Sequence, residues 1–493
     1  MNPALPIACT SSGLLRGRVE DGINVFCNVP YAAPPVGPLR FQRPAAVTPW
    51  EGERDATRHG PVPPQPVSRL RAVMGDFTAE QDEDCLTLTI TTPAVDGRRR
   101  PVLIWLHGGA FWTGAGSLDW YSGVPMSRHG DVVVVGVNYR LGAFGFMHLP
   151  GVSEPNLGLH DQMAALKWVS QEIEAFGGDP DNITVMGQSA GGLSILAMLA
   201  HPPSRQLMRR AIVQSAPFGR LLRSRREAQS LAETLQETLG ITDPAQWRSI
   251  SAQAINEAQL KVARSLASFA NTSPVFIPVA DHELLGEDVV GAALAGAAEC
   301  DVMIGYTRDE MSAFFGADEQ IRNATAEQTR AVFARMFGAA ADQALAEYRE
   351  RTGASDNASL LGAMLGDASF GAGVHAFAER LADLGRPAWV YRFDWAAPDN
   401  RFAACHCCEI PFMLDTLPAW QAPMLEGGDP ASMARLAAQM RDAWIAFATH
   451  GDPSHPGLAH WPRYEQARQT MLLDVHSRVA NDPAGRTRWK YWP

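Results

Sequence analysis

Residues 183–192 read ITVMGQSAGG and contain the pattern Gly-x-Ser-x-Gly with Ser189 at its centre. The pentapeptide alone is weak evidence, because a chain with 43 glycines matches it by chance in roughly one case in five. Here, however, an apolar strand-like run precedes the serine and an apolar helical run follows it. Gly187 and Gly191 relieve crowding at such a strand-to-helix turn, and the helix N-terminus favours a developing anion. The stretch therefore predicts a nucleophilic serine.

Apolar runs alternate with helix-patterned segments from residue 101 onward. Near-continuous apolar runs are typical of parallel strands that are covered on both faces. These runs occur at 102–106, 132–135, 183–186, 302–304 and 389–393. The alternation predicts the α/β class with a central, mostly parallel sheet flanked by helices, and the serine turn narrows this to the α/β-hydrolase fold.

Three further segments are expected outside these strands and their connecting helices. An N-terminal β-hairpin region is expected over about residues 10–45, where Asp21-Gly22 supplies the positive φ of a tight turn. Two helix-rich insertions are expected at about 221–266 and 325–384. We expect these insertions to lie over the active-site edge of the sheet and to form pocket walls.

The composition limits the partners and the location of the chain. Its formal net charge of -11 argues against nucleic acid, because phosphate binding needs clustered lysine and arginine. No run is long and apolar enough for a membrane helix. The seven cysteines have no regular spacing, and residues 1–7 lack the pattern of a secretory signal. These features predict a cytoplasmic protein with no membrane partner.

The segment His107-Gly-Gly-Ala-Phe111 directly follows the strand predicted at 102–106. Backbone N–H groups in a loop of small residues can approach an oxyanion without obstruction by side chains. We therefore expect Gly109 and Ala110 to form an oxyanion hole together with the N–H of Ala190. The alternative is an ordinary glycine-rich turn after a strand.

With these motifs in place, the chain resembles the type B carboxylesterase and cholinesterase family, especially its bacterial para-nitrobenzyl-esterase-like members. The matching segments are 29–41, 83–86, 107–111, 138–142, 156–162, 176–180, the serine turn and 461–464. Because they span nearly the whole chain, the resemblance implies a single domain over residues 1–493. It also implies that the pairs Arg40–Glu83 and Arg140–Asp161 are structural ion pairs.

The acid of the catalytic set follows the strand predicted at 302–304. The resemblance implies Glu310, since the family motif Asp-Glu-Gly uses its glutamate. Met311 stands where the family has glycine, so Asp309 stays open as an alternative. The order nucleophile, acid, histidine requires a later histidine.

Several histidines satisfy that order, and His406 is the one that matches the family pattern His-x-x-Glu after a buried strand. His375 lies in a helical run and is expected to be a packing residue. Cys405, Cys407 and Cys408 flank His406, which raises a zinc alternative. Adjacent donors lack the spacing of a chelate, however, so neither a metal nor an organic cofactor is expected.

The pocket is expected to be aromatic and neutral. Gln188 precedes the serine where most family members carry glutamate, which weakens any case for a cationic substrate. The aromatic candidates for the pocket wall are Phe111, Trp112, Trp120, Phe218, Phe314 and Phe315.

Together these residues predict a hydrolase of small to medium carboxylic esters. Ser189 would form an acyl-enzyme, His406 would act as general base and Glu310 would orient the imidazole. The expected partner is a small-molecule ester, and the expected state is a monomer, with a weak homo-oligomer as the alternative. Two other functions stay open: an acyltransferase that uses the same acyl-enzyme, and a non-catalytic binding member of the family.

Overall fold

The Ser189 turn lies in the middle of an 11-stranded sheet in the computed structural model, which describes residues 5–219, 222–485 and 490–491. The strands from β8 to β15 are parallel, and the strands beyond them at both edges are antiparallel. In spatial order they are β16 (Arg478–Asn481), β15 (Gln469–Leu473), β14 (Trp389–Phe393), β13 (Asp301–Thr307), β10 (Arg210–Gln214), β9 (Gly178–Gln188), β7 (Arg100–Leu106), β8 (Val133–Val137), β6 (Thr87–Thr92), β4 (Ile23–Pro30) and β3 (Arg18–Glu20). The predicted mostly parallel central sheet is confirmed.

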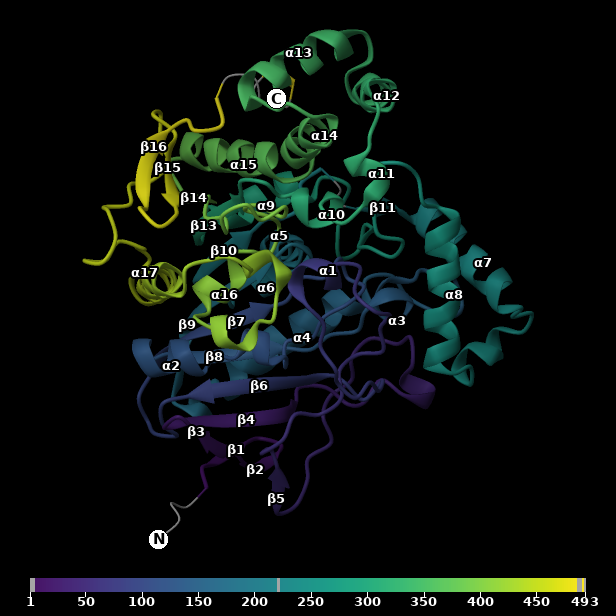
Figure 1. Cartoon of the computed structure of the whole chain (residues 1–493). Helices are drawn as coiled ribbons and strands as arrows, with labels where there is room; N and C mark the ends of the chain where they lie inside the picture. The colour runs from purple at the N-terminus through teal and green to yellow at the C-terminus, as the bar shows by residue number, and fades with distance from the viewer. Residues whose placement is uncertain (1–4, 220–221, 486–489, 492–493) are drawn as a thin grey trace.

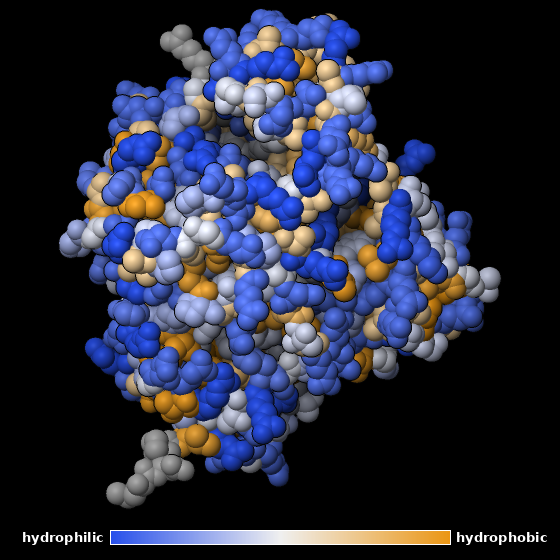
Figure 2. Space-filling view, in the orientation of Figure 1, coloured by the Kyte–Doolittle hydropathy of each residue, from blue (hydrophilic) through white to orange (hydrophobic). Residues whose placement is uncertain are grey.

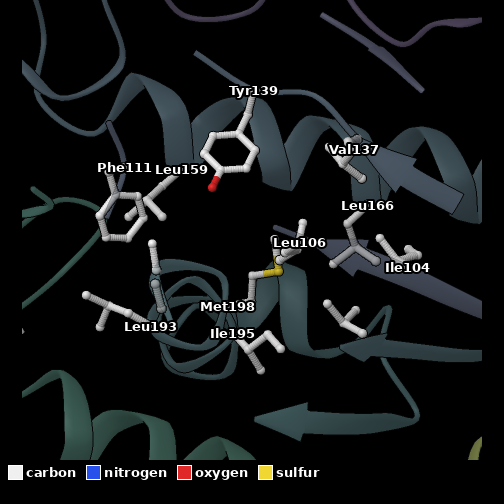
Figure 3. Packing of buried hydrophobic residues seen from close by; sticks show 14 of the residues in the cluster. Ile104, Leu106, Phe111, Val137, Tyr139, Leu159, Leu166, Leu193, Ile195 and Met198 are labelled. Carbon is white, nitrogen blue, oxygen red and sulfur yellow. The ribbon is translucent and has the colours of Figure 1, made fainter. Parts of the chain in front are cut away.

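Side chains of β7 alternate between two hydrophobic cores, one on each face of the sheet. Ile104 and Leu106 belong to one core, while Leu103 and Trp105 belong to the other. Helices α4 (Leu157–Glu172), α5 (Ala190–Ala200), α9 (Val289–Ala297) and α15 (Ala372–Asp383) cover the first face. Figure 3 shows Ile104 and Leu106 facing side chains of α4 and α5. Helices α2 (Val124–Gly130), α16 (Ile410–Met413) and α17 (Pro430–His450) cover the second face.

The N-terminal region divides into a small sheet and an extension of the large one. Strands β1 (Ile7–Thr10), β2 (Gly13–Arg16) and β5 (Glu53–Asp55) form a three-stranded sheet. The sequence predicts one strand over 14–20, whereas the structure breaks it at Gly17 and pairs β3 with β4 around Asp21-Gly22. A Cβ atom at Gly17 would lie 2.7 Å from the Val25 carbonyl oxygen, so the chain passes too close there for a larger residue.

Two groups of helices stand away from the sheet (Figure 1). The first contains α7 (Arg225–Leu239) and α8 (Ala252–Ser265), flanked by β11 (Arg223–Ser224) and β12 (Val279–Ala280). Residue 221, where the first insertion is predicted to begin, lies outside the described residues. The second group contains α10 (Ser312–Phe315), α11 (Glu319–Arg322), α12 (Ala326–Phe337), α13 (Ala341–Thr352) and α14 (Asn357–Gly366). Three short helices complete the set: α1 (Arg71–Met74), α3 (Gly142–Phe146) and α6 (Pro202–Arg205).

The face of the molecule in Figure 2 is dominated by hydrophilic residues, with hydrophobic residues in small separate groups. Across the described ranges of the chain, no helix has both the length and the apolarity needed to cross a membrane.

Candidate active site

Ser189 occupies a strained turn between β9 and α5. Its backbone has φ 57° and ψ -117°, a conformation that non-glycine residues rarely adopt. The Ser189 N–H donates to the Gln214 carbonyl at 2.8 Å, and the Leu193 N–H donates to the Ser189 carbonyl at 3.0 Å. These bonds to a neighbouring strand and to the first turn of α5 hold the serine at the carboxyl end of the sheet.

The two glycines of the serine motif are required by close packing. A Cβ atom on Gly191 would lie 2.0 Å from the Leu106 carbonyl oxygen, and one on Gly187 would lie 2.8 Å from the Gly191 backbone. Backbone atoms cannot move aside as a flexible side chain can, so a larger residue at either position would displace the turn from β7. The expected role of these glycines is confirmed.

Glu310 and His406 form a buried pair next to this turn. The Nδ1 atom of His406 lies 2.5 Å from Oε2 of Glu310, and the two side chains are 1% and 2% exposed. The other carboxylate oxygen, Oε1, accepts the Thr307 N–H at 2.9 Å. Since both oxygens of Glu310 are engaged, the carboxylate and the imidazole have defined orientations.

Asp309 points away from this pair. Its Oδ2 atom accepts from Arg308 Nε at 3.0 Å and from the Ala404 N–H at 3.2 Å. Adjacent residues of one loop thus have different partners, and the structure brings Glu310, not Asp309, to His406.

Gln188 contacts both ring nitrogens of His406. The Gln188 Nε2 atom lies 3.2 Å from His406 Nε2 and 3.5 Å from His406 Nδ1. Gln188 Oε1 accepts from the Cys407 thiol at 3.5 Å. Burial raises the pKa of the Cys407 thiol well above its usual value, so the thiol stays protonated and can donate. Ser189 Oγ forms no hydrogen bond with the imidazole in the described part of the chain.

Glu409 lies three residues beyond His406 and is fully buried. Burial, followed by the charge of Glu310, raises its pKa to about 8, so the carboxyl is protonated near neutral pH. Its Oε1 atom accepts from Gln214 Nε2 at 3.5 Å. The Glu409 carboxyl therefore adds no negative charge to the site near neutral pH.

The loop after β7 presents amide hydrogens to the same place. Gly109 has φ 111° and Ala110 has φ 59°, and a Cβ atom on Gly109 would lie 1.9 Å from the Thr113 carbonyl oxygen. The N–H groups of Gly109, Ala110 and Ala190 donate to no other residue that the structure describes, and all three residues line one cavity. Three unpaired donors at one cavity form the kind of site that binds an oxyanion.

The cavity has a volume of about 380 Å³ and is lined by Ser189, His406 and mostly apolar side chains. Of the aromatic candidates, Phe111, Trp112, Trp120 and Phe314 line it. The other two do not lie among its lining residues: Phe218 packs on Phe377 at a ring distance of 5.8 Å, and Phe315 is buried in a separate core beside α14. Both follow residues that do reach the cavity, Pro217 and Phe314.

Phe370 is a lining residue that the sequence reasoning missed. Its ring centre lies 4.9 Å from that of His406, and it comes from the helical turn Asp367–Gly371, which links α14 to α15. Because this turn has helical periodicity in the sequence, no local signal distinguishes Phe370 from an ordinary core residue.

His375 and the seven cysteines lie outside the Glu310–His406 pair. His375 lies between the hydroxyls of Tyr306 and Tyr464, each at 3.1 Å. All seven cysteines are free, and no group of three or more potential metal ligands occurs in the described ranges. The pairs Arg140–Asp161 and Arg40–Glu83 are both present and are buried or nearly so.

Comparison with known proteins gives matches over nearly the full length. Residues 4–492 match the family described as Carboxylesterase family. The chain is 37% identical to phenmedipham hydrolase of Pseudarthrobacter oxydans, with 97% of each chain covered. It is 36% identical to para-nitrobenzyl esterase of Bacillus subtilis (strain 168), with 99% of this chain and 98% of the relative covered.

A solved structure extends the similarity to the fold. Carboxylesterase EST55 of Geobacillus stearothermophilus matches with a TM-score of 0.88 and 34% identity, covering 99% of this chain and 100% of that chain. The chain therefore belongs to the carboxylesterase family, and it is a carboxylic ester hydrolase with the α/β-hydrolase fold.

Proposed function

We propose that the chain is a serine carboxylesterase that hydrolyses esters of small to medium size through an acyl-enzyme on Ser189. The observation that carries this proposal is the buried pair His406 Nδ1 to Glu310 Oε2, 2.5 Å apart, beside a cavity that Ser189 also lines. A cavity volume of about 380 Å³ lies in the range of small-molecule sites.

In the proposed mechanism, Ser189 Oγ attacks the ester carbonyl while His406 Nε2 accepts its proton. Glu310 keeps the Nδ1 proton in place and stabilises the imidazolium that forms. For this step the imidazole exchanges its contact with Gln188 for one with Ser189, since active-site hydrogen bonds often form fully only with substrate bound. His406 then gives the proton to the leaving alcohol, and water repeats the sequence on the acyl-enzyme.

The tetrahedral intermediate carries a negative charge on the former carbonyl oxygen. The N–H groups of Gly109, Ala110 and Ala190 would meet this charge, and each donor is worth about 10²- to 10³-fold in rate. Because the amides are held by the β7 loop and by the start of α5, they need no reorganisation when the charge develops.

The test combines substitution with covalent labelling. Wild-type protein is expected to hydrolyse para-nitrophenyl acetate and butyrate and to gain the mass of an organophosphonate on the peptide that contains Ser189. Ser189→Ala should lose both properties. Ser194→Ala is the matched control, since its hydroxyl donates to the Ala190 carbonyl within α5. Label on another residue, or activity that survives Ser189→Ala, would overturn the proposal.

A further inference from the structure

The charges on the cavity wall differ from those of the chain as a whole. The chain has 53 acidic residues against 42 basic ones. The described residues that line the cavity nevertheless include Arg69 and Arg223 and no aspartate or glutamate. Gln188, the polar side chain beside His406, is also neutral. The side chains that the structure describes along the cavity thus include positive charges and no negative ones, which favours a substrate that carries negative charge.

The two arginines differ in exposure, because Arg223 is partly buried and Arg69 is exposed. Arg223 donates through Nε to the Val275 carbonyl at 3.0 Å and through Nη2 to the Pro274 carbonyl at 2.8 Å, so it braces the cavity wall. Arg69 is exposed and donates through Nη1 to the Thr272 carbonyl at 2.8 Å. A guanidinium has five N–H donors in a planar fork, which suits a carboxylate.

Arg69 lies close to the reacting groups. Its Cζ atom lies 5.1 Å from the centre of the Phe314 ring, and that centre lies 5.4 Å from the centre of the His406 ring. Phe314 is thus in contact with both the cation and the imidazole. A substrate that reaches from His406 to the guanidinium would therefore lie against the Phe314 ring.

The position of His406 identifies which half of the substrate Arg69 meets. In the proposed mechanism His406 returns its proton to the leaving oxygen, so the alcohol half of the ester lies against the wall beside the imidazole. That wall contains Phe314 and Phe370, and Arg69 lies beyond Phe314 at the mouth of the cavity. The exposed side chains of Val67 and Leu266 also line the cavity and would contact the apolar part of the alcohol.

The geometry points to esters whose alcohol part carries a carboxylate as a preferred substrate class, with Arg69 binding that carboxylate. This inference rests on the proposed function and names its substrate.

The experiment uses two esters of equal shape. 4-Acetoxybenzoate carries a carboxylate on the alcohol half, and 4-acetoxybenzamide replaces it by a neutral amide. With rates normalised to hydroxide-catalysed hydrolysis, wild-type kcat/KM is expected to be about tenfold higher for the carboxylate, a gain typical of a charge-assisted pair. Arg69→Gln should remove this preference, so that the two esters have equal normalised kcat/KM.

Two controls distinguish direct binding by Arg69 from the electrostatic effect of any nearby positive charge. Arg71→Gln removes the same charge two residues away at the start of α1, outside the cavity lining, and should preserve the preference. The para-nitrophenyl monoester of glutaric acid carries its carboxylate on the acyl half and should not respond to Arg69→Gln.

The outcomes are distinct. Equal wild-type rates for the two acetoxy esters, or an equal loss in Arg69→Gln and Arg71→Gln, would overturn the inference while esterase activity persists. A glutarate monoester that depends on Arg69 would overturn the assignment to the alcohol half. Failure of the proposed function itself would show differently, as no hydrolysis of either acetoxy ester and no effect of Ser189→Ala, and would overturn both.

Discussion

The side-chain Nε2 atom of Gln188 lies 3.2 Å from Nε2 and 3.5 Å from Nδ1 of His406, the imidazole that the proposed mechanism uses for proton transfer. A protonated Nε2 would face the amide N–H of Gln188. The side chain at position 188 is therefore placed to act on the general base of the proposed mechanism.

A first prediction concerns Gln188→Glu. The mechanism needs a neutral imidazole, so wild-type kcat/KM is expected to fall on the acid side of its pH profile. A carboxylate at position 188 would favour the imidazolium, as Glu310 already does from the other side, whereas the Cys407 thiol and the Glu409 carboxyl are uncharged near neutral pH. The acid limb of the profile should therefore move up by about one pH unit.

Gln188→Met serves as the control for this shift, because it removes the hydrogen bond without adding charge. The acid limb of the Gln188→Met profile should lie closer to the wild-type limb than the acid limb of the Gln188→Glu profile does. Superimposable profiles for wild type and Gln188→Glu would show that the side chain at 188 does not act on the base.

A second prediction separates the two neighbouring acids. Glu310→Gln should lower kcat by about 10³- to 10⁴-fold, because the amide cannot hold the Nδ1 proton or balance the imidazolium charge. Asp309→Asn should keep kcat within about fivefold of wild type, since Asp309 bonds to Arg308 and to the Ala404 N–H rather than to His406. Steady-state kinetics with para-nitrophenyl butyrate would measure both, and the reverse ranking would assign the acid to Asp309.

A third prediction concerns the pH dependence of stability. Burial raises the pKa of Glu409 from its ordinary value of 4.5 to about 8 in the folded protein. The folded state therefore binds more protons between these values, and the free energy of unfolding falls as the pH rises from 4.5 to about 8 and levels off above it. Over pH 5 to 9, wild type should lose roughly 2–4 kcal/mol more than Glu409→Gln, measured by urea unfolding at several pH values. Parallel pH curves for the two proteins would mean that Glu409 is ionised in the folded state.

A fourth prediction compares two glycine substitutions. Gly191→Ala should destabilise the fold by more than about 3 kcal/mol or prevent it, because the new Cβ would lie 2.0 Å from a backbone oxygen. Gly362→Ala, in the interior of α14, should stabilise by about 0.5–1 kcal/mol, because the nearest atom there is 4.0 Å away. Thermal unfolding of the purified variants would rank them, and a Gly191→Ala protein as stable as wild type would contradict the packing argument.

The local motifs were predictable because each depends on neighbours in sequence. The turn at Ser189 needs a strand before it, a helix after it and small residues on each side, and all of these stand within residues 183–200. The His107 to Phe111 loop is similar. In the pocket, by contrast, local pattern could not separate Phe314, which lines the cavity, from Phe315, which is buried in another core. The two differ only in the direction that α10 gives to each side chain.

By itself the sequence determined the class of fold, the position of the Ser189 turn and the loop at residues 107–111, because strand, turn and helix signals act over a few residues. Only the tertiary structure decided that Glu310 rather than Asp309 meets His406, 96 positions away, and that Gln188 contacts the same imidazole from 218 positions away. The physical reason is that these partners are chosen by the packing of distant strands and loops at one sheet edge. A hydrogen bond of this kind depends on orientations that no local stretch of sequence specifies.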